Sequence, residues 1–276
     1  MIEINEIMLS GGGSKGIIYI GVLKALQDLE NWKIINVNLK TIKGISIGSV
    51  VGLLIIIGYT YQELKTIIFK KKLKTLKKMK LGNLINGFGL DTGDKLIKWI
   101  TELMETKHCH INITMKELYE KYNKELIIIA SDLKTNQQIH WDKSCDKTVL
   151  DCIRCAITIP FFFTLQEHYV DGAVLNNFPF EFKDNNYGFV IKNKTKQFTE
   201  IQTLIDYIKS LYKIIRKRKI LEENQNEKNI IKIYNDTSVI DFDLDTKTKM
   251  ELIECGYKNT LEYFFNLKIT MENNNV

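Results

Sequence analysis

Hydrophobic residues occur along the chain in two alternating patterns, short isoleucine-rich runs and longer stretches with helical spacing. Residues 2–9 alternate between apolar and polar positions, which predicts a first strand. Residues 17–29 carry apolar side chains three and four positions apart and predict a helix, and residues 34–42 predict a second strand. Strands that alternate with helices in this way indicate an α/β fold with a mostly parallel sheet.

The alternation continues to the end of the chain. Further strands are predicted over residues 126–130, 137–141, 187–191 and 230–234. Further helices are predicted over residues 94–105, 115–122, 148–155, 198–223 and 247–265. The first of these is expected to have Asp94 as its N-cap. Because no internal repeat or linker interrupts the pattern, we expect one domain over residues 1–276. Its predicted architecture is a three-layer α/β fold with helices on both faces of the central sheet.

A G-x-S-x-G pattern, Gly44 to Gly48, lies between the second strand and a long apolar stretch. This layout predicts a strand, a sharp turn and a helix, a nucleophile elbow in which the Ser46 hydroxyl stands clear of the sheet. Gly44 and Gly48 are then needed because the two backbones pass too closely to leave room for a Cβ atom. The helix N-terminus favours the negative charge of an oxyanion. The alternative interpretation is a Gly/Ser turn between buried elements, because so short a pattern also recurs by chance.

A glycine-rich segment joins the first strand to the first helix. Its residues are Gly11, Gly12, Gly13, Ser14, Lys15 and Gly16. Backbone N–H groups in such a turn form a cradle for an anion at the helix N-terminus. A phosphate group and the oxyanion of an acyl transfer both fit this chemistry.

The same segment matches G-x-G-x-x-G, which makes a dinucleotide-binding oxidoreductase an alternative function. That function requires an acidic residue at the end of the second strand to bind the ribose, and residues 34–42 contain no Asp or Glu. The phosphate-loop pattern fails as well, because Ile17 rather than lysine follows Gly16.

Asp171 and Gly172 follow a predicted strand end at Tyr169 and Val170. Carboxylates at the carboxyl ends of strands collect where α/β sheets bind ligands. Asp171 is therefore a candidate catalytic acid or base. The alternative is structural, since Asp-Gly is a common turn dipeptide.

A basic, amphipathic helix is predicted after a capping box at Thr60 and Glu63. Its lysines are Lys65, Lys70, Lys71, Lys72, Lys74, Lys77, Lys78 and Lys80. Such a helix can adsorb to anionic lipid, although a solvated helix face gives the same pattern. A second basic cluster covers residues 209–219, and residues 82–93 form a glycine-rich loop, a candidate lid. Nucleic-acid binding is not expected, because neither cluster interleaves aromatic residues in a recognisable module.

Composition places the chain among ordinary globular proteins, with 45% apolar and 26% charged residues and a net charge of +6. The N-terminus lacks a cationic region followed by an apolar one, so no secretory signal is predicted. The longest apolar run, residues 45–59, is too short to span a bilayer. We therefore expect a cytoplasmic protein that is soluble or peripheral on membranes.

Metal ligands do not cluster in the sequence. Cys152 and Cys155 have C-x-x-C spacing, but no second pair completes a zinc site. His108 and His110 lie two positions apart with no third ligand in view. We expect reduced cysteines on a helix face and no metal ion.

Four motifs appear together in one order, and with them the chain resembles the patatin-like phospholipases. They are the glycine loop, the G-x-S-x-G elbow, a segment from Cys155 to Pro160, and Asp-Gly-Ala at residues 171–173 continuing to Asn177-Phe178-Pro179. The third motif departs from the family, because Ala156 stands where the family has serine. The resemblance covers about residues 4–191, and we expect residues 192–276 to pack against this part.

The resemblance implies a lipid acyl hydrolase of the phospholipase A or lysophospholipase type. Ser46 would be the nucleophile and Asp171 its base, in a dyad that proceeds through an acyl-enzyme without a metal or cofactor. The glycine loop would form the oxyanion hole, and Gly172 and Ala173 the turn beside the base. The implied substrate is a phospholipid or lysophospholipid at a membrane surface, with the basic helices helping adsorption.

Two further alternatives remain open. A Ser–His–Asp triad in hydrolase order needs a histidine after the acid, but all four histidines precede Asp171, and only His168 lies near it in sequence. A non-catalytic lipid-binding module could retain the same scaffold, although the intact Ser46, Asp171 and glycine loop argue against it.

Overall fold

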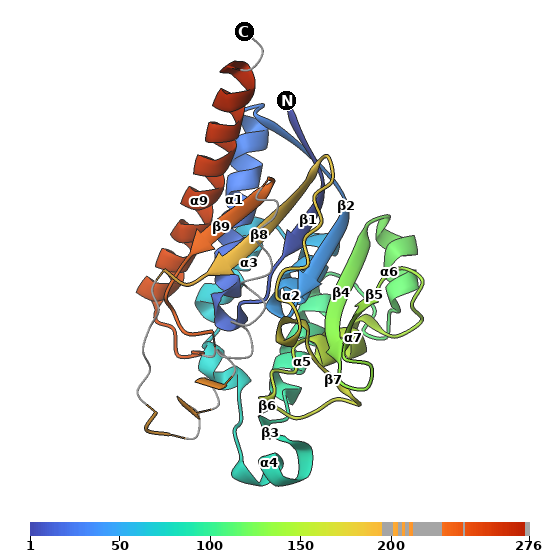
Figure 1. The fold of residues 1–276 in the computed structure, drawn as a ribbon. Helices are drawn as coiled ribbons and strands as arrows, with labels where there is room; N and C mark the ends of the chain where they lie inside the picture. Colours follow the sequence, from blue (N-terminus) through green and yellow to red (C-terminus); the bar gives the residue numbers. More distant parts are fainter. Residues whose placement is uncertain (195–200, 204–205, 208–209, 212–227, 240, 274–276) are drawn as a thin grey trace.

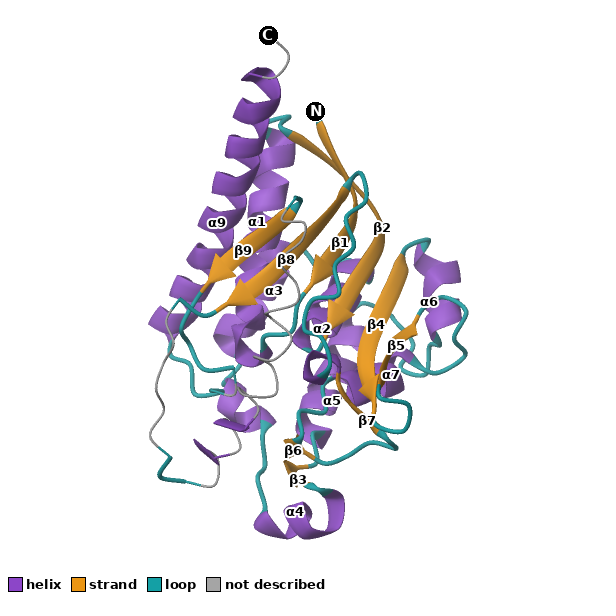
Figure 2. Ribbon diagram, viewed as in Figure 1, coloured by secondary structure: helices purple, strands orange, loops and turns teal. Residues whose placement is uncertain are grey.

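The structure is a computed structural model, and it describes residues 1–194, 201–203, 206–207, 210–211, 228–239 and 241–273. Within these ranges the chain forms a seven-stranded sheet in the order β5-β4-β2-β1-β8-β9, with β7 paired to β4 (Figure 2). Its strands are β1 (Ile2–Leu9), β2 (Ile35–Ile45), β4 (Glu125–Asp132), β5 (Gln137–Trp141), β7 (Tyr169–Asp171), β8 (Asn186–Lys192) and β9 (Ile230–Tyr234). β5 and β7 run antiparallel to β4, and the other pairs are parallel. The predicted mostly parallel α/β sheet is confirmed.

The described helices connect these strands. Their bounds are α1 (Ile18–Asn31), α2 (Ile47–Ile56), α3 (Tyr61–Lys70), α4 (Leu81–Gly87), α5 (Asp94–Thr106), α6 (Met115–Tyr122), α7 (Val149–Ala156) and α9 (Thr246–Asn273). Short 3-10 turns are η1 (Gly13–Ile17), η2 (Leu73–Leu76) and η3 (Gly172–Val174). A small second sheet pairs β3 (Gly89–Asp91) with β6 (Phe161–Phe163). None of the helices described is both long enough and apolar enough to cross a bilayer.

The two faces of the sheet bury different sets of side chains, because successive residues of a strand point to opposite faces. Ile7 and Ile128 point into the main core, which also includes residues of α1, α2 and α9. Met8 and Ile129 point to the other face and join a smaller cluster. The loop over residues 175–185 crosses that second face in front of the strands (Figure 1). Its aromatic rings, Phe178 and Phe180, stack 5.5 Å apart against the smaller cluster.

The C-terminal helix α9 packs along α1, side by side in Figure 1. The contact is close because each helix places a glycine against the backbone of the other. A Cβ atom at Gly21 would overlap the Ile253 carbonyl, and one at Gly256 would overlap the Ile18 carbonyl. The two helices therefore approach each other more closely than larger side chains would permit.

Three local predictions were wrong. The predicted basic helix begins at its capping box as expected, but it ends at Lys70. Lys71 adopts an extended conformation instead, and Leu73 and Leu76 of η2 are buried in the main core. Residues 82–93, predicted as a loop, contain most of α4 and all of β3, and Gly93 rather than Asp94 is the N-cap of α5. The helix predicted over residues 198–223 and the basic cluster at 209–219 fall largely outside the described residues.

Candidate active site

The strand–turn–helix layout predicted around Ser46 is present. β2 ends at Ile45 and α2 begins at Ile47, and Ser46 between them has φ 54° and ψ −125°. A non-glycine residue with positive φ is strained, at a cost of about 1–3 kcal/mol. A Cβ atom at Gly44 would overlap the Ser49 nitrogen, and one at Gly48 would overlap the Leu9 carbonyl. Both glycines therefore permit the close packing that holds Ser46 in this conformation.

The glycine loop lies directly beside the elbow. A Cβ atom at Gly11 would come within 3.2 Å of the Ser46 Cβ, and one at Gly16 would overlap the Ile47 side chain. Gly13 has φ 54°, in the left-handed region that favours glycine. The loop thus lies close to Ser46 because glycine at positions 11 and 16 leaves room for the elbow.

Asn177 holds the start of this loop through both ends of its carboxamide. The Gly11 N–H donates to Asn177 Oδ1 at 3.1 Å, and Asn177 Nδ2 donates to the Gly11 carbonyl at 3.3 Å. These bonds connect two segments 166 residues apart in the sequence. They fix Gly11 relative to the loop that follows Asp171.

The register of β4 brings Asp171 to the neighbourhood of Ser46. Ile45, just before Ser46, pairs with Ile129, and Asp171 pairs with the next residue, Ala130. β2 runs parallel to β4 and β7 runs antiparallel to it, so the carboxyl ends of β2 and β7 meet head to head along β4. This arrangement places the turn at Ser46 next to the turn at Asp171.

The carboxyl group of Asp171 is buried and oriented by its own turn. The residue is 1% exposed, and its Oδ1 accepts a hydrogen bond from the Ala173 N–H at 2.9 Å. The Asp171 N–H donates to the Thr158 carbonyl at 2.8 Å, and its carbonyl accepts from Ser131 Oγ at 3.1 Å. At Gly172, a Cβ atom would approach the Ile129 carbonyl to 2.6 Å. Side-chain and backbone bonds together leave the carboxylate little freedom to turn.

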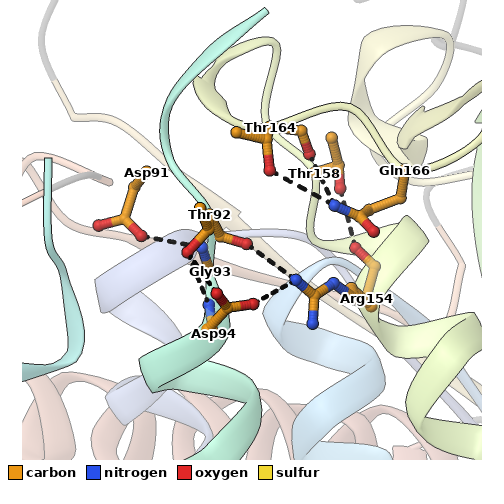
Figure 3. Close-up of polar contacts among 8 residues, drawn as sticks. All are labelled: Asp91, Thr92, Gly93, Asp94, Arg154, Thr158, Thr164 and Gln166. Carbon is orange, nitrogen blue, oxygen red and sulfur yellow. Dashed lines mark hydrogen bonds and ion pairs between the residues drawn. The ribbon is translucent and has the colours of Figure 1, made fainter. Parts of the chain in front are cut away.

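Thr158 is itself held by a network at the start of α5 (Figure 3). Its hydroxyl donates to the Arg154 carbonyl at 2.8 Å, and the Arg154 guanidinium binds the Asp94 carboxylate and the Thr92 carbonyl. Burial raises the pKa of Asp94, but hydrogen bonds from Arg154 and Thr92 outweigh it and lower that pKa below its ordinary value. The segment behind Asp171 is thereby tied to α5 and α7.

Ser46 and Asp171 line one small cleft together with Gly11, Gly12 and Gly13. A larger, almost wholly apolar cavity adjoins this cleft, and Ser46 and Gly13 line both. Its volume is about 960 Å³ when the space open to solvent is included. Its walls come from α2, α3, η2 and α5, with side chains such as Val51, Leu54, Leu64, Ile68, Leu76 and Leu103. Such a cavity offers room for a long apolar chain beside the Ser46 hydroxyl.

The sequence pattern of the patatin-like phospholipase family matches residues 7–182, which hold the glycine loop, the elbow and Asp171. The chain belongs to this family. A probable lipid hydrolase, 463L of Invertebrate iridescent virus 6, is 30% identical over 74% of this chain and 71% of its own length. Protein R571 of Acanthamoeba polyphaga mimivirus is 28% identical over 96% of this chain and 95% of its own. The crystal structure of VipD from Legionella pneumophila shares the fold, with a TM-score of 0.62 and 15% identity over 95% of this chain and 67% of its own.

In this patatin-like domain Lys15 points away from the cleft. Its ammonium group is buried and donates to Asn193 Oδ1 at 2.6 Å and to the Asn235 carbonyl at 2.7 Å. The side chain therefore ties the glycine loop to the segments that follow β8 and β9. Its backbone N–H donates to the Gly12 carbonyl at 3.1 Å and closes the turn.

A segment that the sequence did not associate with the site lies across the glycine loop of the patatin-like domain. The Ser14 N–H donates to the Val239 carbonyl at 2.9 Å, and Ser14 Oγ donates to the Ser238 carbonyl at 2.9 Å. Val239 also lines the small cleft, and Phe242 lines the apolar cavity. In this structure one peptide group of the loop is therefore bonded to the C-terminal part of the chain.

The other candidate groups lie apart from the cleft. The His168 ring contacts Tyr169, and its Nε2 lies 3.8 Å from Asp132 Oδ1, at the far end of β7. Cys152 and Cys155 are buried on α7, and burial raises the pKa of Cys155 to about 11, so its thiol is protonated at neutral pH. In the part of the chain that the structure describes, no three His, Cys, Asp or Glu side chains group as metal ligands would.

Proposed function

We propose that the chain is a lipid acyl hydrolase that cleaves fatty-acyl esters of phospholipids or lysophospholipids through a Ser46–Asp171 dyad. The observation that carries this proposal is the shared cleft, in which a strained serine, a buried carboxylate and a glycine loop lie beside a large apolar cavity. Membership of the patatin-like phospholipase family and the likeness to a probable lipid hydrolase support it.

In the first step Ser46 Oγ attacks the ester carbonyl while Asp171 accepts the hydroxyl proton. The tetrahedral intermediate places its negative charge against the peptide N–H groups of Gly12 and Gly13, and against that of Ser14 once this N–H leaves the Val239 carbonyl. Asp171 then passes the proton to the leaving alcohol, and the fatty acyl group remains on Ser46. Water, deprotonated by Asp171, attacks this acyl-enzyme, and Asp171 returns the proton to Ser46 Oγ as the fatty acid leaves.

The basicity of Asp171 decides how much of the rate enhancement must come from other groups of the site. A carboxylate of ordinary basicity is a weak base towards a serine hydroxyl. Most of the barrier must therefore be lowered by alignment and by donors already aimed at the oxyanion, each contributing about 3–4 kcal/mol. Strain at Ser46 and the fixed Asp171 carboxyl provide the alignment, and the apolar cavity receives the acyl chain.

Adsorption to the membrane would use the lysines that follow α3. Two further lysines, Lys65 and Lys70, lie on α3 itself, and those that follow it lie partly on η2 and partly on extended backbone, rather than on one helix. Each lysine near an anionic surface contributes about 1 kcal/mol of attraction.

The proposed function is tested by replacing each dyad residue and measuring hydrolysis of a soluble short-chain ester and of phospholipid vesicles. We expect Ser46→Ala to abolish both activities and Asp171→Asn to lower them at least a hundredfold. Ser49→Ala is the matched control, because Ser49 is buried one turn along α2. Full activity of Ser46→Ala would overturn the mechanism. Failure of a fluorophosphonate to label Ser46 in the unmodified chain would favour a non-catalytic lipid-binding module instead.

A further inference from the structure

Helix α4 is a short helix whose large apolar side chains point to solvent. It has seven residues, and none of them is buried. Leu81 is 72% exposed and Ile85 80% exposed, and their spacing of four puts them on one face of the helix. Phe88, which ends the helix, is 64% exposed, and Phe161 on the neighbouring strand β6 is 45% exposed. We call Leu81, Ile85 and Phe88 the apolar tip.

The fold holds this tip in place although most of its side-chain area is exposed. The Lys80 N–H donates to the Leu90 carbonyl at 2.7 Å, and the Leu165 N–H donates to the Gly87 carbonyl at 2.9 Å. Phe88 has φ 60°, which is unfavourable for a residue with a side chain. A glycine would adopt this backbone without strain, so the turn by itself does not call for an aromatic ring. A short helix of this kind is marginal in water without packing, which points to a surface that covers it.

The chain segment that leads to the tip carries charge of a single sign. Between Leu64 and Leu90 the sequence contains no Asp or Glu. It contains the lysines Lys65, Lys70, Lys71, Lys72, Lys74, Lys77, Lys78 and Lys80. Lys78 and Lys80 are exposed immediately before α4. Exposed apolar side chains next to exposed lysines match the interface of an anionic bilayer, where the apolar groups enter the acyl region and the lysines meet the head groups.

The tip lies at the end of the molecule that carries the carboxyl ends of the parallel strands. Figure 1 shows α4 beyond the carboxyl ends of the parallel strands, and Ser46 directly follows the carboxyl end of β2. β3, which follows the tip, pairs with β6, and Phe163 of β6 lines the apolar cavity. A bilayer against the tip would therefore face the end of the molecule that holds Ser46 and the β3–β6 pair beside the cavity.

We propose that the apolar tip of α4 inserts into the interface of an anionic phospholipid bilayer and docks the enzyme with its acyl cavity facing the lipid. This inference rests on the proposed lipid hydrolase function, because docking of this kind would present lipid to the cavity. A bilayer fits better than a protein partner because of the area available. A stable protein interface buries roughly 800 Å² of surface on each partner, and a seven-residue helix offers much less surface than that.

Vesicle sedimentation tests the docking in a Ser46→Ala background, so that the lipid stays intact. The probes are vesicles of phosphatidylcholine alone and of phosphatidylcholine with phosphatidylglycerol. We expect Leu81→Ser/Ile85→Ser/Phe88→Ser to weaken binding to the mixed vesicles at least tenfold. The matched control is Ile269→Ser/Met271→Ser, because these side chains are 54% and 49% exposed at the far end of α9. That control should bind as tightly as the parent chain.

Two further measurements complete the experiment. Ile85→Trp should show fluorescence quenching by brominated acyl chains in the mixed vesicles, beyond that of the parent chain. Lys78→Glu/Lys80→Glu should weaken binding at least tenfold at low salt, and this difference should shrink as salt is raised.

The outcomes separate the two proposals. With Ser46 present, the tip variant should hydrolyse a soluble short-chain ester at the unaltered rate, which also shows that it folds. Unchanged vesicle binding of the tip variant, or no binding by the parent chain, would overturn the docking. A tip variant that only converts a dimer to a monomer would assign the tip to a second copy of the chain and would also overturn it. If no ester were hydrolysed by any variant while tip-dependent binding persisted, the hydrolase function would fail and the docking surface would stand.

Discussion

At the scale of single residues, the site is built mainly from backbone geometry. Ser46 has a strained conformation, and close packing around Gly44 and Gly48 maintains it. The glycine loop contributes peptide groups rather than side chains. This construction makes the site sensitive to the addition of a single methyl group at the right position.

Gly48→Ala should destabilise the elbow, because its Cβ would overlap the Leu9 carbonyl of β1. Overpacking of this kind costs about 1–3 kcal/mol, and the shift of the elbow should also slow ester hydrolysis. Gly82→Ala is the control, since a Cβ there meets nothing within 4 Å. Urea denaturation and kinetics on a soluble ester measure both effects. Equal stability of the two variants would contradict the close packing.

Asn177 is expected to act as a positioning residue. Asn177→Ala removes both hydrogen bonds that hold Gly11, so the loop should lose its alignment with Ser46. We expect kcat on a soluble ester to fall at least tenfold with KM nearly unchanged, because the oxyanion forms only in the transition state. Asn86→Ala, on exposed α4, is the control. A rise in KM with constant kcat would instead indicate a role in substrate binding.

At the scale of elements, the head-to-head meeting of β2 and β7 brings the proposed dyad together. Both strands pair with β4 at adjacent residues, Ile129 and Ala130. Helix α3 forms one wall of the apolar cavity, and its N-terminus is fixed by the capping box of Thr60 and Glu63. The position of that wall depends on how firmly α3 begins.

The capping box predicts a pH dependence of stability. Hydrogen bonds from Lys107, at 2.7 Å, and from Thr60 lower the pKa of Glu63 from 4.5 to about 2. A depressed carboxyl pKa stabilises the fold above the unfolded pKa, and this stabilisation is lost as pH falls towards the folded pKa. The difference in free energy of unfolding between the unmodified chain and Glu63→Gln should therefore be largest near pH 7. It should decrease as pH falls from about 4.5 to 2. Urea denaturation across this range measures it, and a difference independent of pH would contradict the assignment.

At the scale of the whole molecule, the C-terminal part of the chain contributes to the site. α9 packs on α1, and the Ser238 and Val239 carbonyls bind Ser14. Lys15 strengthens this connection through Asn193 and Asn235. The glycine loop is thus held by residues more than 170 positions away in the sequence.

Formation of an oxyanion should loosen the segment containing Ser238 and Val239. The Ser14 N–H, now bonded to the Val239 carbonyl, would turn to the phosphonyl oxygen when a fluorophosphonate reacts with Ser46. We expect faster hydrogen exchange in the peptide that contains Ser238 and Val239 after labelling, with exchange in β1 unchanged. Equal exchange before and after labelling would show that the Ser14 amide does not serve the oxyanion.

Local features of the fold could be predicted because they depend on residues near one another in the chain. The alternation of residues 2–9 predicted β1 with its observed bounds, and Thr60 and Glu63 predicted a capping box that is present. The elbow at Ser46 followed from glycines at fixed spacing between a strand and a helix. Side-chain period and turn chemistry act over a few residues, so the sequence itself carries them.

Only the tertiary structure decided which distant segments meet. Three contacts join positions separated by long stretches of chain. They are the antiparallel pairing of β7 with β4, the hydrogen bonds between Asn177 and Gly11, and the hydrogen bond between Ser14 and Val239. The early end of α3 also depends on distant packing, since Leu73 and Leu76 enter the core and Lys249 donates to the Ile68 carbonyl. Strand order and burial arise from the whole chain packing against itself, and a local pattern does not encode them.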